Sequence, residues 1–177
     1  MIFDLLLCFL TTTMLVFSGA VVALGEMETG IVKCLIVTPL GKKGYLFSRI
    51  GLPAVIAGLY DLFIVTFFSL TEIPFLETVI LSFFSVIMAI VVCMFILAFA
   101  RNRLEGMVFI KLCGFFVTGI PVPFFVHSDL KYLAGIFPSF WITQYAMNNS
   151  MINLLAALIV SGIWIILLSV KYDKKLI

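Results

Sequence analysis

The one acidic side chain inside a long apolar stretch is Asp61, near the middle of the run from Phe47 to Leu70. An ionised carboxylate at the centre of a bilayer costs about 2.5–3.5 kcal/mol on insertion scales, so we expect Asp61 to face protein or water rather than lipid. Two roles stay open. Asp61 lines a path and neutralises a cationic molecule there, or it stays protonated and bonds neighbours beside Tyr60 or a hydroxyl across the bundle.

Residue patterns typical of catalytic sites are absent from the sequence. The single histidine, His127, stands near Asp129, and no serine lies in a GxSxG setting. The segment Gly41-Lys42-Lys43-Gly44 lacks both the spacing and the hydroxyl of a phosphate-binding GxxxxGK[ST] loop. We interpret His127 and Asp129 as ordinary polar groups at a surface. The sequence therefore predicts no catalytic residue.

The four cysteines do not form a predicted metal site. Cys8, Cys93 and Cys113 lie in apolar runs and Cys34 in a short amphipathic one, without a CxxC pair or a nearby histidine. We expect all four to be small buried apolar side chains. No metal and no cofactor are predicted.

The composition is that of a membrane protein. Of the 177 residues, 64% are hydrophobic and 11% are charged, and the mean hydropathy is +1.29. An average soluble domain is about 45–50% apolar and 25% charged. The apolar residues form unbroken runs that a single soluble core could not bury. We therefore expect no water-soluble domain of independent size.

Five apolar stretches are long enough to cross a bilayer, because a helix needs about 20 residues to span the hydrocarbon. They lack the alternation of barrel strands, and backbone groups in lipid must be paired within each segment. The predicted fold is an all-α bundle forming one transmembrane domain. The expected spans are residues 5–24, 47–70, 78–100, 107–126 and 151–170, and the long connections are 25–46 and 127–150.

Basic residues are concentrated in alternate connections, and only Lys131 lies in the other set. Because cytoplasmic segments collect Lys and Arg, we expect the N-terminus outside and the C-terminus in the cytoplasm of a multi-pass protein of the cell membrane. The residues on the expected cytoplasmic side are Lys33, Lys42, Lys43, Arg49, Arg101, Arg103, Lys111, Lys171, Lys174 and Lys175.

The connection 25–46 is too long for a simple loop. Between Glu26 and Val37, apolar residues recur at helical spacing, namely Met27, Ile31, Cys34 and Leu35. We expect a short amphipathic helix here, with Glu26 and Glu28 favouring its N-terminus. Thr38-Pro39 then predicts an N-cap and the start of a second helical piece. The amphipathic helix either floats among lipid headgroups or docks onto a cytoplasmic partner.

Three short motifs follow one another along the chain. The first is Glu26-Met-Glu-Thr-Gly30, continued by Thr38-Pro39-Leu40 and Tyr45-Leu46; the second is Leu104-Glu105-Gly106 with Lys111 and Pro121; the third is Gly135, Pro138 and Trp141. Their order and their placement among the spans resemble the membrane (permease) subunits of type-2 ATP-binding-cassette exporters, in particular drug-exporter-like members. In that family the patterns are E-x-x-x-G…TPL…YL, V-E-G…K…P and G…P-x-x-W, so Leu104 departs from the usual valine.

The resemblance implies a permease subunit that works with a second permease chain, identical or related, and with cytoplasmic ATPase subunits that hydrolyse the ATP. No nucleic-acid partner is expected, and the membrane is expected to be a bacterial plasma membrane. In such permeases the connection after the second helix is a coupling helix that rests in a cleft of the ATPase. That role maps onto Glu26, Glu28, Gly30, Thr38 and Pro39, and the second motif marks an inner loop with Glu105, Gly106 and Lys111.

Such permeases usually have six spans and a cytoplasmic N-terminus, so we expect that the first helix is missing and that the chain is a truncated product. The aromatic stretch from Leu130 to Asn149 is either an interfacial belt or, as in the resembled family, a re-entrant pair of short helices broken at Pro138 that closes the outer gate with Trp141. Two other functions stay open: a non-transporting assembly or regulatory subunit, and an intramembrane enzyme, which would need a second convergent polar group beside Asp61.

Overall fold

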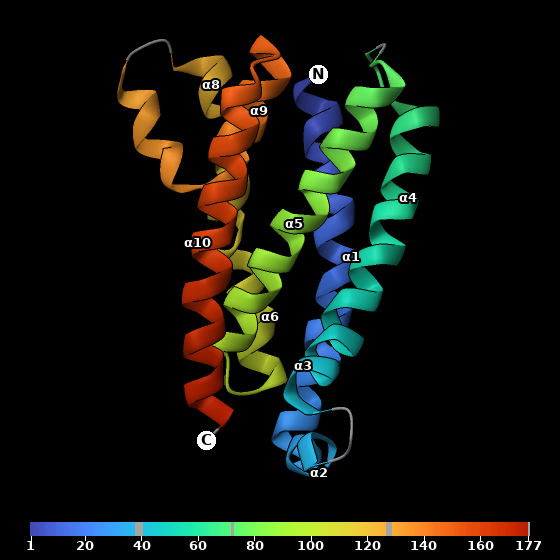
Figure 1. Ribbon diagram of the computed structural model, residues 1–177, viewed down its shortest axis with the longest axis vertical. Helices are drawn as coiled ribbons and strands as arrows, with labels where there is room; N and C mark the ends of the chain where they lie inside the picture. The colour runs from blue at the N-terminus through green and yellow to red at the C-terminus, as the bar shows by residue number, and fades with distance from the viewer. Residues whose placement is uncertain (38–40, 72, 127–128, 177) are drawn as a thin grey trace.

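The computed structural model describes residues 1–37, 41–71, 73–126 and 129–176. The prediction of an all-α fold is confirmed, because every regular element in these ranges is a helix. Five apolar stretches are long enough to cross a membrane and run side by side in one elongated bundle (Figure 1). They are Ile2–Glu28, Gly44–Phe68, Phe75–Phe99, Arg103–Phe125 and Met151–Lys175.

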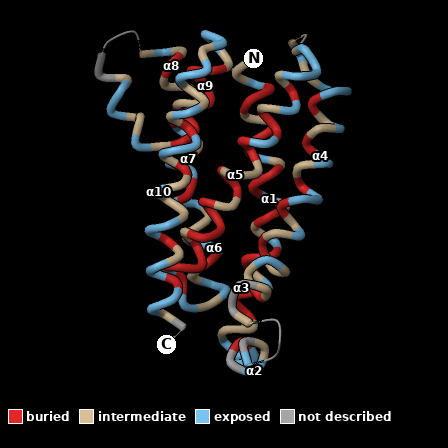
Figure 2. Tube along the Cα trace, viewed as in Figure 1, coloured by how far each residue is buried: buried red, intermediate tan, exposed pale blue. Residues whose placement is uncertain are grey.

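Helix α5 (Phe75–Phe99) forms the centre of the bundle. It packs against α1 (Ile2–Glu28), α4 (Leu52–Phe68) and α10 (Met151–Leu176). The consecutive residues 91–94 of α5 are all buried, so this turn of the helix is covered on every side, whereas residues near its two ends are exposed (Figure 2). Helices α4 and α10 leave broad apolar faces exposed, which is the surface expected of helices that contact lipid or another membrane chain.

The two ends of the bundle differ in charge. One end, called here the basic end, carries the short helices α2 (Ile31–Val37) and α3 (Gly41–Leu46) together with the last turn of α10 (Figure 1). The opposite end holds residue 1 and the turn between α4 and α5. Most described basic side chains gather at the basic end, which is the distribution that the sequence predicted.

The second span begins with a widened turn. After α3, residues Phe47–Gly51 form a π-helical turn, η1, that leads directly into α4. Pro53 has no N–H to donate to the carbonyl of Arg49, and its ring would collide with that carbonyl in a regular α-helix. The widened turn moves the Arg49 carbonyl toward α1, where Gly19 makes room for it; a Cβ at Gly19 would overlap that oxygen.

The fourth span, expected as one helix over 107–126, consists of three pieces: α6 (Arg103–Leu112), α7 (Gly114–Thr118) and α8 (Val122–Phe125). Cys113 ends α6, and Gly119 and Pro121 lie between α7 and α8. Pro121 and Pro123 lack the N–H groups that would continue the helical hydrogen bonds, which accounts for the second break.

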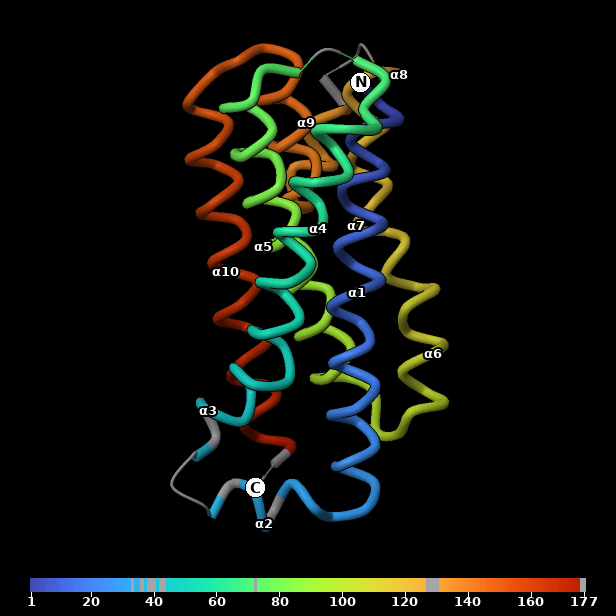
Figure 3. The backbone as a smooth tube through the Cα atoms, turned by 90° about the vertical axis from the view of Figure 1, so that its right-hand side faces the viewer, coloured from blue at the N-terminus to red at the C-terminus, as the bar shows by residue number. Residues whose placement is uncertain are grey.

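The region after the fourth span folds back as a re-entrant hairpin. The 3₁₀ helix η2 (Asp129–Ile136) is followed by α9 (Pro138–Asn148), which packs along α10 (Figure 3). The indole N–H of Trp164 on α10 donates to the carbonyl of Ile136 at 3.0 Å. Trp164 lies about 20 Å along α10 from Met151, so the hairpin reaches about halfway down that helix. This pair of short helices, with α9 beginning at Pro138, has the geometry of the re-entrant alternative. Its role in closing an outer gate stays a prediction.

Candidate functional site

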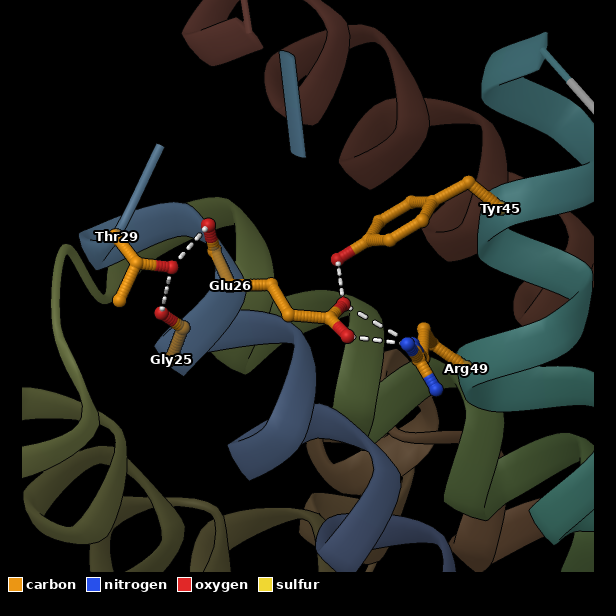
Figure 4. Close-up of polar contacts among 5 residues, drawn as sticks. All are labelled: Gly25, Glu26, Thr29, Tyr45 and Arg49. Carbon is orange, nitrogen blue, oxygen red and sulfur yellow. Dashed lines mark hydrogen bonds and ion pairs between the residues drawn. The ribbon is translucent and has the colours of Figure 1, made fainter. Parts of the chain in front are cut away.

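Three side chains join the basic ends of the first two spans. The carboxylate of Glu26 on α1 accepts a hydrogen bond from Nε of Arg49 at 3.0 Å, and its other oxygen pairs with Nη2 of the same guanidinium (Figure 4). The hydroxyl of Tyr45 donates to Glu26 Oε2 at 2.9 Å. Two-point guanidinium–carboxylate contacts are stronger and more directional than single ones. The end of α1 is therefore held firmly against η1 and α3.

The position of Glu26 explains why it needs these partners. The prediction that Glu26 and Glu28 start an amphipathic helix is wrong, because α1 continues through both and ends at Glu28. A carboxylate near a helix C-terminus is disfavoured by the helix dipole, and Arg49 offsets that cost. The helix stops at Gly30, whose φ of 75° is accessible to glycine at little cost, and the Thr29 hydroxyl donates to the carbonyl of Gly25 at 3.1 Å (Figure 4).

The helix α2 turns a different face inward than expected. Val32 is its buried anchor and Leu35 is half-buried, whereas Ile31 and Cys34 are exposed and Val37 is 86% exposed. The prediction that Cys34 is buried is therefore wrong, while Cys8, Cys93 and Cys113 are buried as predicted. Thr38 and Pro39 lie outside the described residues, so their capping role stays a prediction.

The second predicted motif lies against the same end of α1. Glu28 accepts a hydrogen bond from the backbone N–H of Arg103 at 2.7 Å, and its carboxylate lies 3.8 Å from the Arg103 guanidinium. The Arg103 side chain covers Gly25, where a Cβ would overlap it. Gly106 likewise leaves room for the Leu24 side chain, which a Cβ at this position would overlap. The start of α6 is thus fitted onto the end of α1.

Glu105 organises the turn that precedes α6. Its carboxylate accepts the backbone N–H of Arg101 at 2.7 Å, while Asn102 accepts the N–H of Glu105 at 2.7 Å, an arrangement that caps the helix. The structure therefore brings Glu28, Glu105 and Gly106 to one site, which we call the α1–α6 junction. Glu26 faces η1 and α3 instead. Lys111 is not part of the junction, because it is exposed about 12 Å further along α6.

Asp61 is buried inside the bundle and has an exposed fraction of 0%. It faces protein, as expected, between Cys8 of α1 and Ser82 of α5. Neither carboxylate oxygen has a hydrogen-bond partner of ordinary geometry among the described residues, and neither has the Ser82 hydroxyl. Ser82 also lines a pocket of about 340 Å³ between α4 and α5. Asp61 thus lies one side chain away from an accessible space.

A second buried carboxylate, for which the sequence predicted no role, lies at the opposite end. Asp4 is 1% exposed and accepts the backbone N–H of Leu70 at 2.7 Å and the hydroxyl of Thr71. It ties the start of α1 to the turn after α4. From the sequence, Arg49 is predicted only as one of the basic residues of the cytoplasmic side, because its pairing with Glu26 spans 23 positions and no local pattern relates the two.

The expected outer-gate residues lie in the re-entrant hairpin. Pro138 starts α9, and the indole N–H of Trp141 donates to the Gly135 carbonyl at 2.8 Å, which closes the turn of the hairpin. Ser139 donates to the carbonyl of Phe116 on α7, and Gly119 leaves room for Ser139. The hairpin is therefore attached to the broken fourth span as well as to α10.

Comparison with known proteins gives one family. A family model described as fluoroquinolones export permease protein Rv2686c-like matches residues 1–170. Two Mycobacterium tuberculosis proteins, fluoroquinolones export permease proteins Rv2686c (strain H37Rv) and MT2760 (strain CDC 1551), are each 25% identical to this chain over 142 residues. The alignments cover 77% of this chain and 56% of each relative. The chain thus spans about half the length of these relatives.

No solved structure matches the chain. The family match covers nearly all of it, and the helical bundle agrees with a membrane permease. The chain therefore belongs to the Rv2686c-like family of fluoroquinolones export permease proteins.

Proposed function

We propose that this chain is the membrane subunit of an ATP-binding-cassette exporter, and that the segment α2–α3 receives the motion of a separate ATPase. The observation that carries this proposal is the Glu26–Arg49–Tyr45 contact. It pins both ends of the α2–α3 segment to the bundle, at α1 and at η1. A push on α2 is then transmitted to two spans at once, rather than absorbed by a loose loop.

The α1–α6 junction extends the same linkage to a third span. Because Glu28 contacts Arg103, a displacement of the end of α1 also moves the start of α6. In our proposal α1, α4 and α6 respond together when the ATPase subunits close, and the two halves of the transporter rock relative to one another. The basic end lies in the cytoplasm in this arrangement, and a second permease chain completes the path.

The surface that contacts the ATPase is the exposed side of α2. Its apolar residues Ile31, Cys34 and Val37 point away from the bundle, although Val32 and Leu35 anchor the helix from behind. An apolar face at the water-exposed end of a bundle is costly unless a partner covers it. We propose that the cleft of the ATPase covers it.

The relatives are named as fluoroquinolones export permeases, which makes a fluoroquinolone-type drug the first candidate cargo. Asp61 is the candidate residue of the path, because its buried carboxylate has no hydrogen bond of ordinary geometry among the described residues and its neighbour Ser82 lines the pocket between α4 and α5. A carboxylate there would offset a positive charge on the cargo.

The test is purification of the tagged chain from its native membrane, followed by identification of any cassette ATPase that accompanies it. We expect an ATPase with the unaltered chain and its loss with Val37→Glu or Gly30→Trp. Leu133→Glu is the matched control, since Leu133 is also a largely exposed apolar residue but lies on η2. A chain that purifies with no ATPase would support the non-transporting assembly or regulatory subunit instead.

A further inference from the structure

A pocket of about 680 Å³ lies at the basic end, between the last turn of α5 and the last two turns of α10. Four of its lining side chains are cationic, and none of the described lining residues is acidic. The lining residues are Ala98, Phe99, Arg101, Lys171, Lys174 and Lys175. The general enrichment of basic residues at a cytoplasmic face accounts for their presence at this end, but not for their convergence on one hollow.

Two of the lysines are held in place. Lys175 donates to the carbonyl of Leu97 at 2.7 Å and also to that of Ala100, so it occupies the free carbonyls at the C-terminus of α5. The ammonium group of Lys171 lies 3.2 Å from the centre of the Phe99 ring, a cation–π contact. These contacts fix the positive charges before any ligand arrives, which lowers the entropy cost of binding.

The positive charge of this pocket is not neutralised from within. Among the described residues, none of the four cations forms an ion pair with a carboxylate. Glu105 acts on Lys175 from outside the pocket lining, and its carboxylate accepts the backbone N–H of Arg101. Arg101 and Lys175 repel one another. An anion in the pocket would relieve that repulsion.

A separate apolar groove lies further along the same face of α10. Leu167, Trp164 and Ile163 lie four, seven and eight residues before Lys171, which places them on its side of the helix at about 6–12 Å along the axis. They line a groove of about 300 Å³ together with Ile136 of the re-entrant hairpin. A ligand that fills both spaces has an anionic head and an apolar tail.

We propose that this pocket binds the phosphate headgroup of an anionic phospholipid, with an acyl chain lying in the groove along Leu167 and Ile163. Clusters of basic residues between transmembrane helices are suited to such headgroups, because each charge attracts the phosphate and the lipid supplies its own apolar contact. The site adjoins the α1–α6 junction, because the N–H of its lining residue Arg101 donates to Glu105. Lipid binding there requires no ATPase.

The test measures binding of phosphatidylglycerol to the purified full chain in a zwitterionic detergent, by native mass spectrometry. The variant Arg101→Gln/Lys171→Gln/Lys174→Gln leaves the structural Lys175 in place. Removing one basic residue weakens binding about fivefold, so the triple variant is expected to bind roughly a hundredfold more weakly. Lys131→Gln is the matched control, because Lys131 also lies over an aromatic ring, that of Tyr132, but belongs to η2 in the re-entrant hairpin. It should bind as the unaltered chain does.

Two further measurements distinguish a lipid headgroup from free phosphate, and the effect of charge from that of side-chain identity. Inorganic phosphate and glycerol 3-phosphate should not displace the lipid, and Leu167→Ser should weaken lipid binding; displacement by free phosphate would overturn the lipid assignment. The charge-preserving triple variant Arg101→Lys/Lys171→Arg/Lys174→Arg should bind within about threefold of the original. Equal loss in both triple variants, or equal binding in all of them, overturns the proposal. The proposal is also overturned if the mass that disappears from the spectra of the triple variant is that of a second protein copy rather than that of a lipid.

Discussion

Removal of the charge of Glu26 is the most direct test of the contact that joins α1 to η1. The Glu26 side chain is 15% exposed and that of Arg49 is 35% exposed, so the pair lies between the surface and the interior. Exposed pairs contribute about 0–1 kcal/mol, and breaking a fully buried pair costs about 3–5 kcal/mol. We therefore expect Glu26→Gln to lower the free energy of unfolding by about 2 kcal/mol, because the Arg49 guanidinium is left partly buried without its partner.

A double-mutant cycle measures that contact directly. Glu26→Gln, Arg49→Gln and the double variant would be unfolded by SDS titration from mixed micelles, with helix content followed by circular dichroism. The coupling energy should be about 1.5 kcal/mol. Tyr45→Phe removes only the hydroxyl that donates to Glu26 and should cost about 1 kcal/mol. If the two charge changes are additive within about 0.3–0.5 kcal/mol, the pair does not stabilise the fold, and the argument that it transmits motion fails.

Three other variants test separate parts of the structure. Gly19→Val should lower the free energy of unfolding by more than about 2 kcal/mol, since its Cβ would overlap the Arg49 carbonyl. The control Gly162→Val should be nearly neutral, because the described structure leaves open space there. Equal unfolding midpoints for the two variants would contradict the close approach of Gly19 to the Arg49 carbonyl. Asp61→Asn should fold normally but export a cationic fluoroquinolone from cells at least tenfold more slowly, and full export would remove Asp61 from the path. Trp164→Phe loses the hydrogen bond to the re-entrant hairpin, so hydrogen exchange in α9 should rise about fivefold, while unchanged exchange would show that the hairpin is held by other contacts.

The features that the sequence predicted correctly are those set by the length and pattern of apolar runs. The five spans and the all-α class follow from hydropathy, and the break at Pro138 was implied by the family resemblance. The end of α1 was misjudged because the apolar span and the amphipathic segment join without a break until Gly30, and only the positive φ there marks the boundary.

The contacts of the candidate site could not be predicted, because they join residues far apart in the chain. Glu28 meets Arg103 across 75 positions, and no local pattern relates them. The need for glycine at position 25 becomes clear only from the structure, in which the Arg103 side chain covers it. The direction in which α2 faces also depended on tertiary packing: its apolar residues lie on both sides, and Val32 rather than Ile31 or Cys34 was selected for burial.

Both ends of α1 are bonded to the same neighbouring span, and this has a consequence for torsion. Asp4 is bonded to the residues that follow α4, and Glu26 is bonded to those that precede it, so the two attachments lie about 33 Å apart along α1. A helix bonded to its neighbour at one end can still rotate about its own axis, but α1 is bonded at both ends to residues flanking α4, which opposes such rotation. The two helices therefore form a ladder with a rung at each end. When α1 and α4 move relative to α5, spin-label distances between these two helices should therefore stay constant.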